Sequence, residues 1–300
     1  MQDTLRSVDR PTIPQRFVEP INAHLLGNLL DIPDYPVIMW IVGRPGMGKT
    51  WQLRRHLELL GFETLSVSAA DLESKYAGEP AKLIQNRYLK AGRLIANGQP
   101  SALVIDDIDT TVGEWEKNTG TVNHQEILAF LMHVADRPTS IELVGAVRRV
   151  PIFFTGNDAN RLYAPLTRHG RTFTFHWSPE PDEKIAVVAA LLGPSGLATA
   201  EVLVTEYPEQ PISFFSQLIV SSAVERVSSS AASNASFRAL LRSDGKHAEQ
   251  LQQEIATARL NTDWLAAARR LTSGPLPQPG QTRRRRPPGT SQRRTRRTRP

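Results

Sequence analysis

The chain has 300 residues, of which 40% are hydrophobic and 22% are charged, and it contains no cysteine. This composition is typical of a globular protein, and the lack of cysteine excludes disulfides, cysteine-ligated zinc and thiol catalysis. The net charge of +6 depends on nine arginines between Arg283 and Arg299; removing them leaves −3, so the rest of the chain gives no electrostatic case for binding nucleic acid.

Residues 1–20 are polar, are interrupted by proline and contain no apolar signal core. We expect them to form a flexible N-terminal arm. No apolar run in the sequence approaches the roughly 20 residues that a membrane helix needs. The sequence therefore predicts a soluble, cytoplasmic protein without a membrane partner.

Strand-like and helix-like segments alternate between residues 21 and 178. The predicted strands are 37–42, 62–67, 102–105, 150–154 and 171–177, and the predicted helices are 21–30, 50–60, 81–96 and 122–135. Within 81–96, Ile84, Tyr88, Ala91 and Ile95 share one helical face. Such alternation predicts an α/β domain with a mainly parallel sheet and helices on both faces.

The pattern changes after Pro179 and Pro181, where strand-like runs largely disappear. Helices are predicted at 182–192, 212–226, 235–242 and 246–271. We therefore expect a small α-helical domain over residues 179–272. Residues 273–300 have almost no apolar side chains and are expected to form a disordered tail rich in arginine and proline.

A glycine-rich loop follows the first predicted strand. It fits the pattern G-x-x-x-x-G-K-[ST] with Gly43, Arg44, Pro45, Gly46, Met47, Gly48, Lys49 and Thr50. In such a loop, backbone N–H groups and the N-terminus of the next helix surround phosphate oxygens. We expect Lys49 to reach the β- and γ-phosphates and the Thr50 hydroxyl to bind Mg²⁺, so ATP and Mg²⁺ are the predicted cofactors. The alternative is a chance match, which the strand–loop–helix context opposes.

Two acids directly follow the apolar run 102–105. A loop of this kind needs a second carboxylate for the metal at the end of a neighbouring buried strand. We expect Asp106 to orient Mg²⁺ and Asp107 to polarise the attacking water. The alternative is a solvated acidic turn at the end of a strand.

Polar residues also follow the predicted strand 150–154. Asn157 is expected to face the γ-phosphate as a sensor, with an Asn-Asp turn as the alternative. Arg168 and Arg171 come shortly after it. Within one chain they would be surface charges, but in a ring they could stabilise the charge on a neighbouring subunit's γ-phosphate.

With these residues in place, the chain resembles Rubisco activase, an AAA+ ATPase, over roughly residues 21–192. The likeness extends beyond the nucleotide motifs to 72–74, 77–84, 87–88, 135–139, 150–152, 155–158, 162–166, 168 and 170–171. It implies an AAA+ α/β nucleotide-binding domain at 21–178, a helical lid at 179–272, and assembly into a ring, usually a hexamer. It also implies that ATP turnover drives pore loops against a protein, which in activases is Rubisco with a sugar phosphate trapped in its active site.

The resemblance assigns further roles by position. Arg168 and Arg171 match the family's inter-subunit arginines. Residues 74–78 fall where AAA+ motors carry the first pore loop, so Tyr76 is the candidate aromatic that grips the substrate; a partly buried surface tyrosine is the alternative. Residues 113–121 would form the second pore loop, with Trp115 exposed.

The chain also departs from the family. The segment before residue 150 is shorter, and from this sequence we expect neither the plant Rubisco-engaging domain at the N-terminus nor a small-subunit-like domain after the lid. Ile219 stands where the second sensor arginine is expected, and Arg226 lies a turn or more too far along to replace it. Asp107 stands where AAA+ motors usually carry glutamate, and its shorter reach predicts slow hydrolysis.

Three functions remain open at this point. The first is ATP-driven remodelling of Rubisco, and the second is the same motor acting on a different protein complex. The third is a nucleic-acid-associated P-loop ATPase that uses the arginine tail, whose binding would depend on salt. The tail is otherwise a solvated segment, and nucleic acid is the least favoured of these partners.

Overall fold

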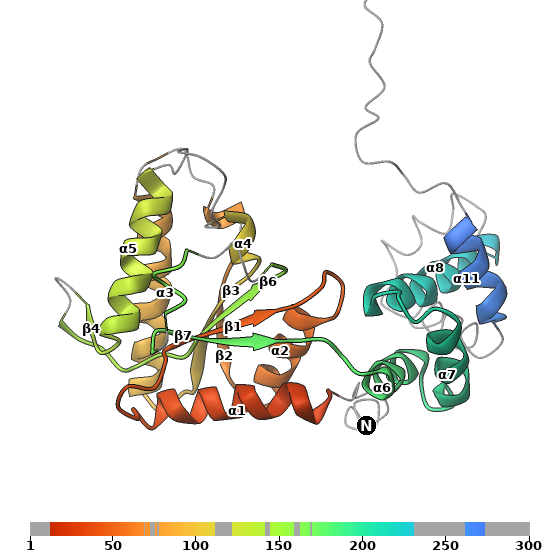
Figure 1. The fold of residues 1–300 in the computed structure, drawn as a ribbon, viewed down its shortest axis with the longest axis horizontal. Helices are drawn as coiled ribbons and strands as arrows, with labels where there is room; N and C mark the ends of the chain where they lie inside the picture. The colour runs from red at the N-terminus through yellow and green to blue at the C-terminus, as the bar shows by residue number, and fades with distance from the viewer. Residues whose placement is uncertain are drawn as a thin grey trace, which may run out of the picture.

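Five parallel strands form the central sheet of the protein, in the order β2-β3-β6-β1-β7 (Figure 1). The computed structural model describes residues 13–68, 70–72, 76, 78–111, 122–141, 145–158, 163–168, 170–230 and 262–273. The strands are β1 (Ile38–Val42), β2 (Glu63–Val67), β3 (Ser101–Ile105), β6 (Ile152–Gly156) and β7 (Thr172–His176). A short antiparallel pair is formed by β4 (Ser140–Ile141) and β5 (Gly145–Ala146). The predicted parallel sheet is therefore confirmed.

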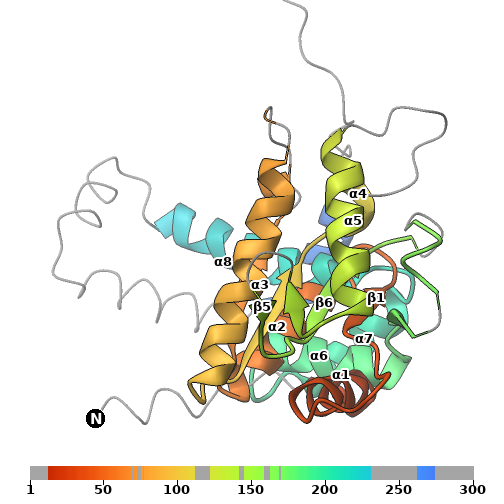
Figure 2. The ribbon, with the colours of Figure 1, turned by 90° about the vertical axis from the view of Figure 1, so that its left-hand side faces the viewer.

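Helices cover both faces of this sheet (Figures 1 and 2). They are α1 (Gln15–Leu29), α2 (Lys49–Leu59), α3 (Glu79–Ala96) and α5 (Val122–Asp136), with the short η1 (Ala70–Leu72) and α4 (Ile108–Thr111) in the connections. Side chains of β1 alternate between the faces: Ile38 and Trp40 pack with α3 and α5, whereas Met39 and Ile41 pack with α1 and α2. The inner strands β1, β3 and β6 are buried along their whole length because helices cover both faces, whereas the edge strands β2 and β7 contain polar and partly exposed residues.

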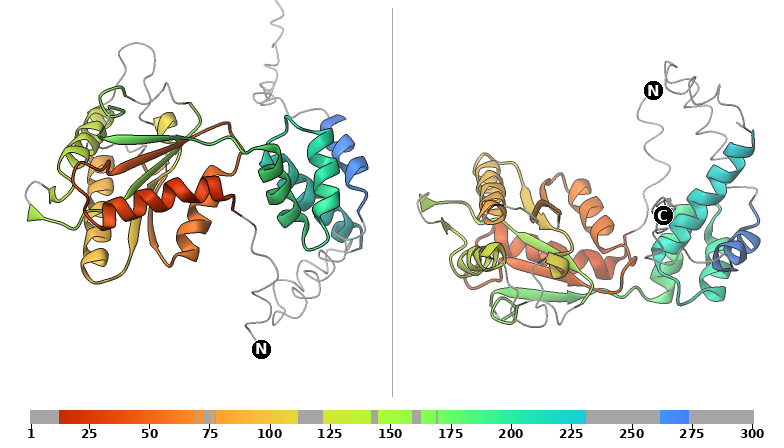
Figure 3. Two further views of the ribbon diagram at one scale, coloured as in Figure 1. Left: turned by 60° about the horizontal axis from the view of Figure 1, so that its bottom comes forward. Right: turned by 90° about the horizontal axis from the view of Figure 1, so that it is seen from above.

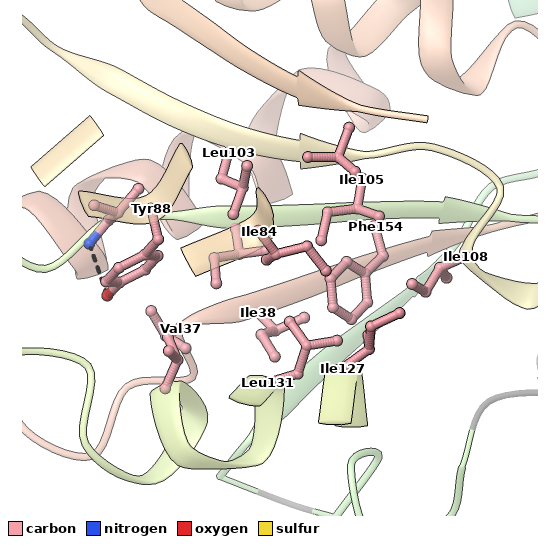
Figure 4. Packing of buried hydrophobic residues seen from close by; sticks show 14 of the residues in the cluster. Val37, Ile38, Ile84, Tyr88, Leu103, Ile105, Ile108, Ile127, Leu131 and Phe154 are labelled. Atoms are coloured by element: carbon pink, nitrogen blue, oxygen red, sulfur yellow. Dashed lines mark hydrogen bonds between the residues drawn. The ribbon is translucent and has the colours of Figure 1, made fainter. Parts of the chain in front are cut away.

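The core between the sheet and the α3–α5 pair is shown in Figure 4. Ile84 and Tyr88 of α3 meet Ile127 and Leu131 of α5 over Phe154 of β6, and all five side chains are fully buried. The Tyr88 hydroxyl donates a hydrogen bond to the Pro138 carbonyl at 2.6 Å. Of the predicted apolar face of α3, Ile84, Tyr88 and Ala91 are fully buried and Ile95 is partly buried against this core.

A separate group of helices follows β7 and has its own apolar core (Figure 3). It comprises α6 (Pro181–Leu192), α7 (Leu197–Glu206), α8 (Ile212–Ser230) and α11 (Trp264–Ser273). A capping box of Glu180 and Glu183, with Pro181 in the first turn, starts α6 at the predicted boundary. In the described part of the chain, no helix combines the length and apolarity needed to cross a membrane.

Three helix predictions need correction. Residues 15–20, assigned to the flexible arm, are helical: α1 begins at Gln15 because Phe17, Ile21 and Leu25 bury one face, and this outweighs the cost of Pro20 inside the helix. Helix α7 was not predicted, because the four β-branched residues in Leu197–Glu206 lower the helix propensity of this segment. Burial of one face of the helix outweighs this low propensity.

The third correction concerns residues 246–271, predicted as one helix. Residues 262–263 are not helical, and α11 begins at Trp264. The Asp263 carboxylate accepts a hydrogen bond from the N–H of Ala266 at 3.0 Å, as an N-terminal cap does. Asp263 thus starts α11, and residues 246–261 lie outside the described residues. The predicted helix 235–242 lies outside the described residues.

Candidate functional site

The glycine-rich loop at residues 43–48 joins the end of β1 to the start of α2, as the motif requires. A Cβ atom on Gly43 would lie 2.1 Å from the Trp177 carbonyl oxygen, so no larger residue fits there. Gly46 and Gly48 adopt φ values of +74° and +78°, in the left-handed region that glycine favours. No side chain caps the N-terminus of α2, so its N–H groups remain directed at the loop.

Lys49 lies folded into this loop and is 6% exposed. Its Nζ donates to the carbonyl oxygens of Gly43 at 2.6 Å and Arg44 at 3.1 Å, and to Asn157 Oδ1 at 3.0 Å. Burial lowers the pKa of Lys49, and the carboxylates of Asp107 and Asp109 partly oppose this shift. The ammonium is therefore held between the loop and the end of β6 by oxygen acceptors alone.

A hydroxyl chain joins the loop to the acid at the end of β3. Thr50 Oγ1 donates to Thr155 Oγ1 at 3.1 Å, and Thr155 Oγ1 donates to Asp106 Oδ1 at 3.3 Å. Thr155 also accepts the N–H of Asp107 at 3.2 Å and is fully buried. Sequence reasoning missed Thr155, although it is a polar residue within the apolar strand β6 and stands two positions before Asn157.

Arg54 is a second residue that sequence reasoning missed. Its guanidinium donates to Asp106 Oδ2 and forms an ion pair with it. Arg54 lies four residues after Thr50 on α2 and therefore on the same side of the helix. That spacing was the available signal. Both oxygens of Asp106 are thus engaged within the chain.

Asp107 has a strained backbone, with φ at +50°, where non-glycine residues are uncommon. Its side chain lines a cavity together with Lys49 and Asn157. The pKa of Asp107 is raised, first by burial and then by the carboxylates of Asp106 and Asp109. Such a carboxylate is a better proton acceptor than an ordinary aspartate.

The cavity has a volume of about 530 Å³, within the range of small-molecule sites. Its lining comes from the α/β core and from the helices after it: Pro45, Gly46, Gly48, Lys49, Thr50, Trp51, Asp107, Asn157, Val187, Leu191, Ile212, Ser213 and Ser216. The two parts also touch directly, because the Ser213 N–H donates to the Gly46 carbonyl at 3.0 Å. The cavity thus lies between the glycine-rich loop and helices α6 and α8.

Three predicted loop residues do not line this cavity. Gly43 packs under Trp177, and Arg44 forms an ion pair of 3.4 Å with Glu209. The Met47 side chain is buried, and its carbonyl accepts the indole N–H of Trp177 at 3.0 Å. Gly43 and Met47 thus contact the segment that connects β7 to α6, whereas Arg44 contacts the segment that connects α7 to α8.

The predicted trans-acting and pore residues lie outside the cavity lining. Arg171 Nε and Nη2 each lie 2.7 Å from a carboxylate oxygen of Asp136, whereas Arg168 is exposed in the preceding turn. Tyr76 is 71% exposed. Ile219, at the expected sensor position, is buried among the helices. The predicted second pore loop, residues 113–121 with Trp115, lies outside the described residues. The same holds for the side chain of Arg226.

Residues 39–179 match the family described as ATPase family associated with various cellular activities (AAA). The ribulose bisphosphate carboxylase/oxygenase activase of Nostoc sp. is 42% identical over 217 residues, covering 69% of this chain and 52% of that protein. The chloroplastic activases of Vigna radiata and Cucumis sativus are 39% and 37% identical, covering 69% and 71% of this chain and 49% and 54% of theirs. The chain spans about half the length of these relatives. Residues 39–179 therefore form an AAA domain, and the chain is similar to Rubisco activases over 69% of its length.

Proposed function

We propose that this chain binds ATP with Mg²⁺ in the cavity, hydrolyses the ATP as part of a ring, and uses the energy to remodel a protein. Rubisco with a trapped sugar phosphate is the leading candidate substrate. The observation that carries the proposal is the contact between Lys49 and Asn157, beside the hydroxyl chain from Thr50 to Asp106. Together they join the loop, β3 and β6 at one edge of the sheet, facing a cavity large enough for a nucleotide.

The phosphates of ATP bind to the N–H groups of the loop and to the N-terminus of α2. Lys49 exchanges its carbonyl partners for phosphate oxygens, since its Nζ already lies among oxygen acceptors. The adenine base of ATP lies against the apolar wall formed by Trp51, Leu191 and Ile212. Support for this orientation comes from the position of the apolar residues, which face the cavity from α2, α6 and α8.

Mg²⁺ fits the oxygen ligands that Thr50 and Asp106 offer. Among the described residues no three His, Cys, Asp or Glu side chains are grouped to hold a metal by themselves, so water and phosphate oxygens would have to supply the remaining ligands. A bound Mg²⁺ would supply positive charge that neutralises the phosphate oxygens. Arg54 must leave Asp106 Oδ2 before this carboxylate turns fully to the metal or its water.

Asp107 accepts a proton from the attacking water, while Asn157 orients the water or the γ-phosphate. Asp107 lines the cavity with Lys49 and Thr50, which supports this role. The short side chain of aspartate makes the turnover slow. Arg168 and Arg171 act on the neighbouring subunit's γ-phosphate, and Arg171 first has to leave Asp136.

The relatives' names support Rubisco as the substrate, and the exposed Tyr76 supports contact with a protein. The test measures activity of Rubisco that has been inhibited by a bound sugar phosphate, with ATP and with either the wild type or Asp107→Asn. We expect activity to return only with the wild type. ATP turnover without any return of activity would exclude Rubisco and favour a different protein complex as the substrate.

A further inference from the structure

Asp109 is a buried carboxylate outside the cavity lining, at the start of the one-turn helix α4. It is 3% exposed. Its Oδ2 accepts two backbone hydrogen bonds, from the N–H of Asn157 at 2.8 Å and from the N–H of Asp158 at 3.1 Å. Burial of a charged group is costly unless hydrogen bonds compensate for it. The two bonds to Oδ2 supply this compensation, and they tie Asp109 to the backbone of residues 157 and 158.

The two N–H groups belong to the turn that follows β6, where the strand no longer pairs with its neighbours. The carboxylate takes the place of the missing strand partner and fixes the direction in which the chain leaves the sheet. The next contact along this path is the hydrogen bond from Lys49 Nζ to Asn157 Oδ1 at 3.0 Å. Asp109 is thus linked to Lys49 through the backbone and side chain of Asn157.

Packing around Gly156 supports the same reading. A Cβ atom on Gly156 would lie 2.9 Å from Asp109 Oδ1 and 2.9 Å from Trp40 Nε1. Neither of these buried atoms has a hydrogen-bond partner within the described part of the chain. Glycine therefore lets the carboxylate approach the end of β6 closely, and the position of the carboxylate depends on the two bonds to Oδ2.

We propose that Asp109 is a positioning residue for ATP hydrolysis, which holds the turn after β6 so that the Asn157 amide stays beside Lys49 and the γ-phosphate. The inference rests on the proposed function of the cavity. Asp109 itself touches neither nucleotide nor metal. It acts through the backbone of Asn157, so its loss should impair the chemical step more than the binding of nucleotide.

The experiment compares Asp109→Ala, Asp109→Asn, Asn157→Ala and the double variant Asp109→Ala/Asn157→Ala with the wild type. For each we measure the Kd for ATP with Mg²⁺, the kcat of hydrolysis and the thermal unfolding midpoint. Asp109→Ala should lower kcat by about tenfold or more and change Kd by less than about threefold. Asp109→Asn keeps an oxygen acceptor and should recover most of the lost kcat. The kcat of the double variant should lie within about twofold of that of Asn157→Ala. Asp109 is proposed to act only through Asn157, so its loss adds little once the Asn157 amide is gone.

A wild-type kcat in Asp109→Ala, or losses that multiply in the double variant, would overturn the inference while leaving the proposed function in place. Absence of turnover in the wild type would overturn both. Should Asp109→Ala fail to fold, Gly156→Ala tests the same contact from the other side. Its Cβ displaces the carboxylate, so kcat should fall with Kd preserved, and an unchanged kcat would contradict the proposal.

Discussion

Arg171 and Asp136 form a two-point ion pair within one chain, with Nε and Nη2 of Arg171 each 2.7 Å from a carboxylate oxygen. A third bond of 2.9 Å runs from Arg171 Nη1 to the Pro165 carbonyl. Arg171, which is proposed to act on a neighbouring subunit, is therefore bound to residues of its own chain in the single subunit.

Mixing two inactive variants tests whether Arg171 acts in trans. Arg171→Ala subunits keep Asp107, and Asp107→Asn subunits keep Arg171, so a mixed ring contains some complete sites. We expect each variant alone to be inactive and the mixture to hydrolyse ATP, measured as phosphate release at several mixing ratios. No recovery at any ratio would show that Arg171 does not complete a neighbour's site.

Arg54 and the proposed Mg²⁺ compete for Asp106, because the guanidinium holds Oδ2 of that carboxylate. Arg54→Gln removes the competitor. The Mg²⁺ concentration at half-maximal ATP binding should fall by about two- to fivefold, the size expected for a partly exposed ion pair. Calorimetric titration of ATP at a series of Mg²⁺ concentrations measures this shift.

The neighbouring residue provides a matched control for this change. Arg55 pairs with Glu58 at 2.7 Å and does not contact Asp106, so Arg55→Gln should keep the wild-type Mg²⁺ requirement. An unchanged or higher requirement in Arg54→Gln would contradict the competition.

Thr155 connects Thr50, Asp106 and the Asp107 backbone through one buried hydroxyl. Thr155→Val keeps the shape and leaves the Asp107 N–H without its acceptor, which should lower the free energy of unfolding by about 1–2 kcal/mol. ATP turnover should fall as well, since the carboxylate and the loop lose their link. Denaturant unfolding and phosphate release measure the two effects. Thr155→Ser retains the hydroxyl, and a loss as large as that of Thr155→Val would contradict its role.

His24 is fully buried, and burial lowers its pKa to about 3. The unfolded chain takes up a proton near the ordinary pKa of 6.5, whereas the folded chain does not. The stability that neutral His24 permits is therefore present above pH 6.5 and is lost as the pH falls toward 3.

Between pH 7 and pH 5 this loss amounts to about 2 kcal/mol for one such group. His24→Phe cannot titrate and should lose about 2 kcal/mol less than the wild type over the same interval. Denaturant unfolding at pH 7, 6 and 5 measures both proteins. Parallel pH curves would show that His24 does not cause the acid sensitivity.

The centre of the sheet could be predicted because β1, β3 and β6 contain apolar runs, each followed by a glycine or a polar residue. The loop at residues 43–50 and the acids after β3 could also be found, because they follow their strands directly in the sequence. That Asn157 contacts Lys49 follows from both lying at the carboxyl edge of a parallel sheet, since β1 and β6 are neighbours.

Other parts of the site depend on contacts that no local pattern encodes. Arg54 and Asp109 are ordinary charged residues in the sequence, and only the folded chain brings them to Asp106 and Asn157. Helix α1 was predicted six residues short because residues 1–20 are polar and interrupted by proline, whereas burial of Phe17 stabilises the helix from Gln15. Tertiary packing thus overrode local propensity where the sequence prediction was wrong.

The most direct test of the account is the rate of phosphate release from Mg²⁺–ATP by Asp107→Asn, measured at ATP concentrations that saturate binding. The cavity is proposed to bind nucleotide through the loop and to activate water through Asp107, so the change should leave ATP binding intact. We predict a rate at least about 100-fold below that of the wild type, as expected when a general base is lost. A wild-type rate in Asp107→Asn would contradict the account, because the water would then be activated by a different group.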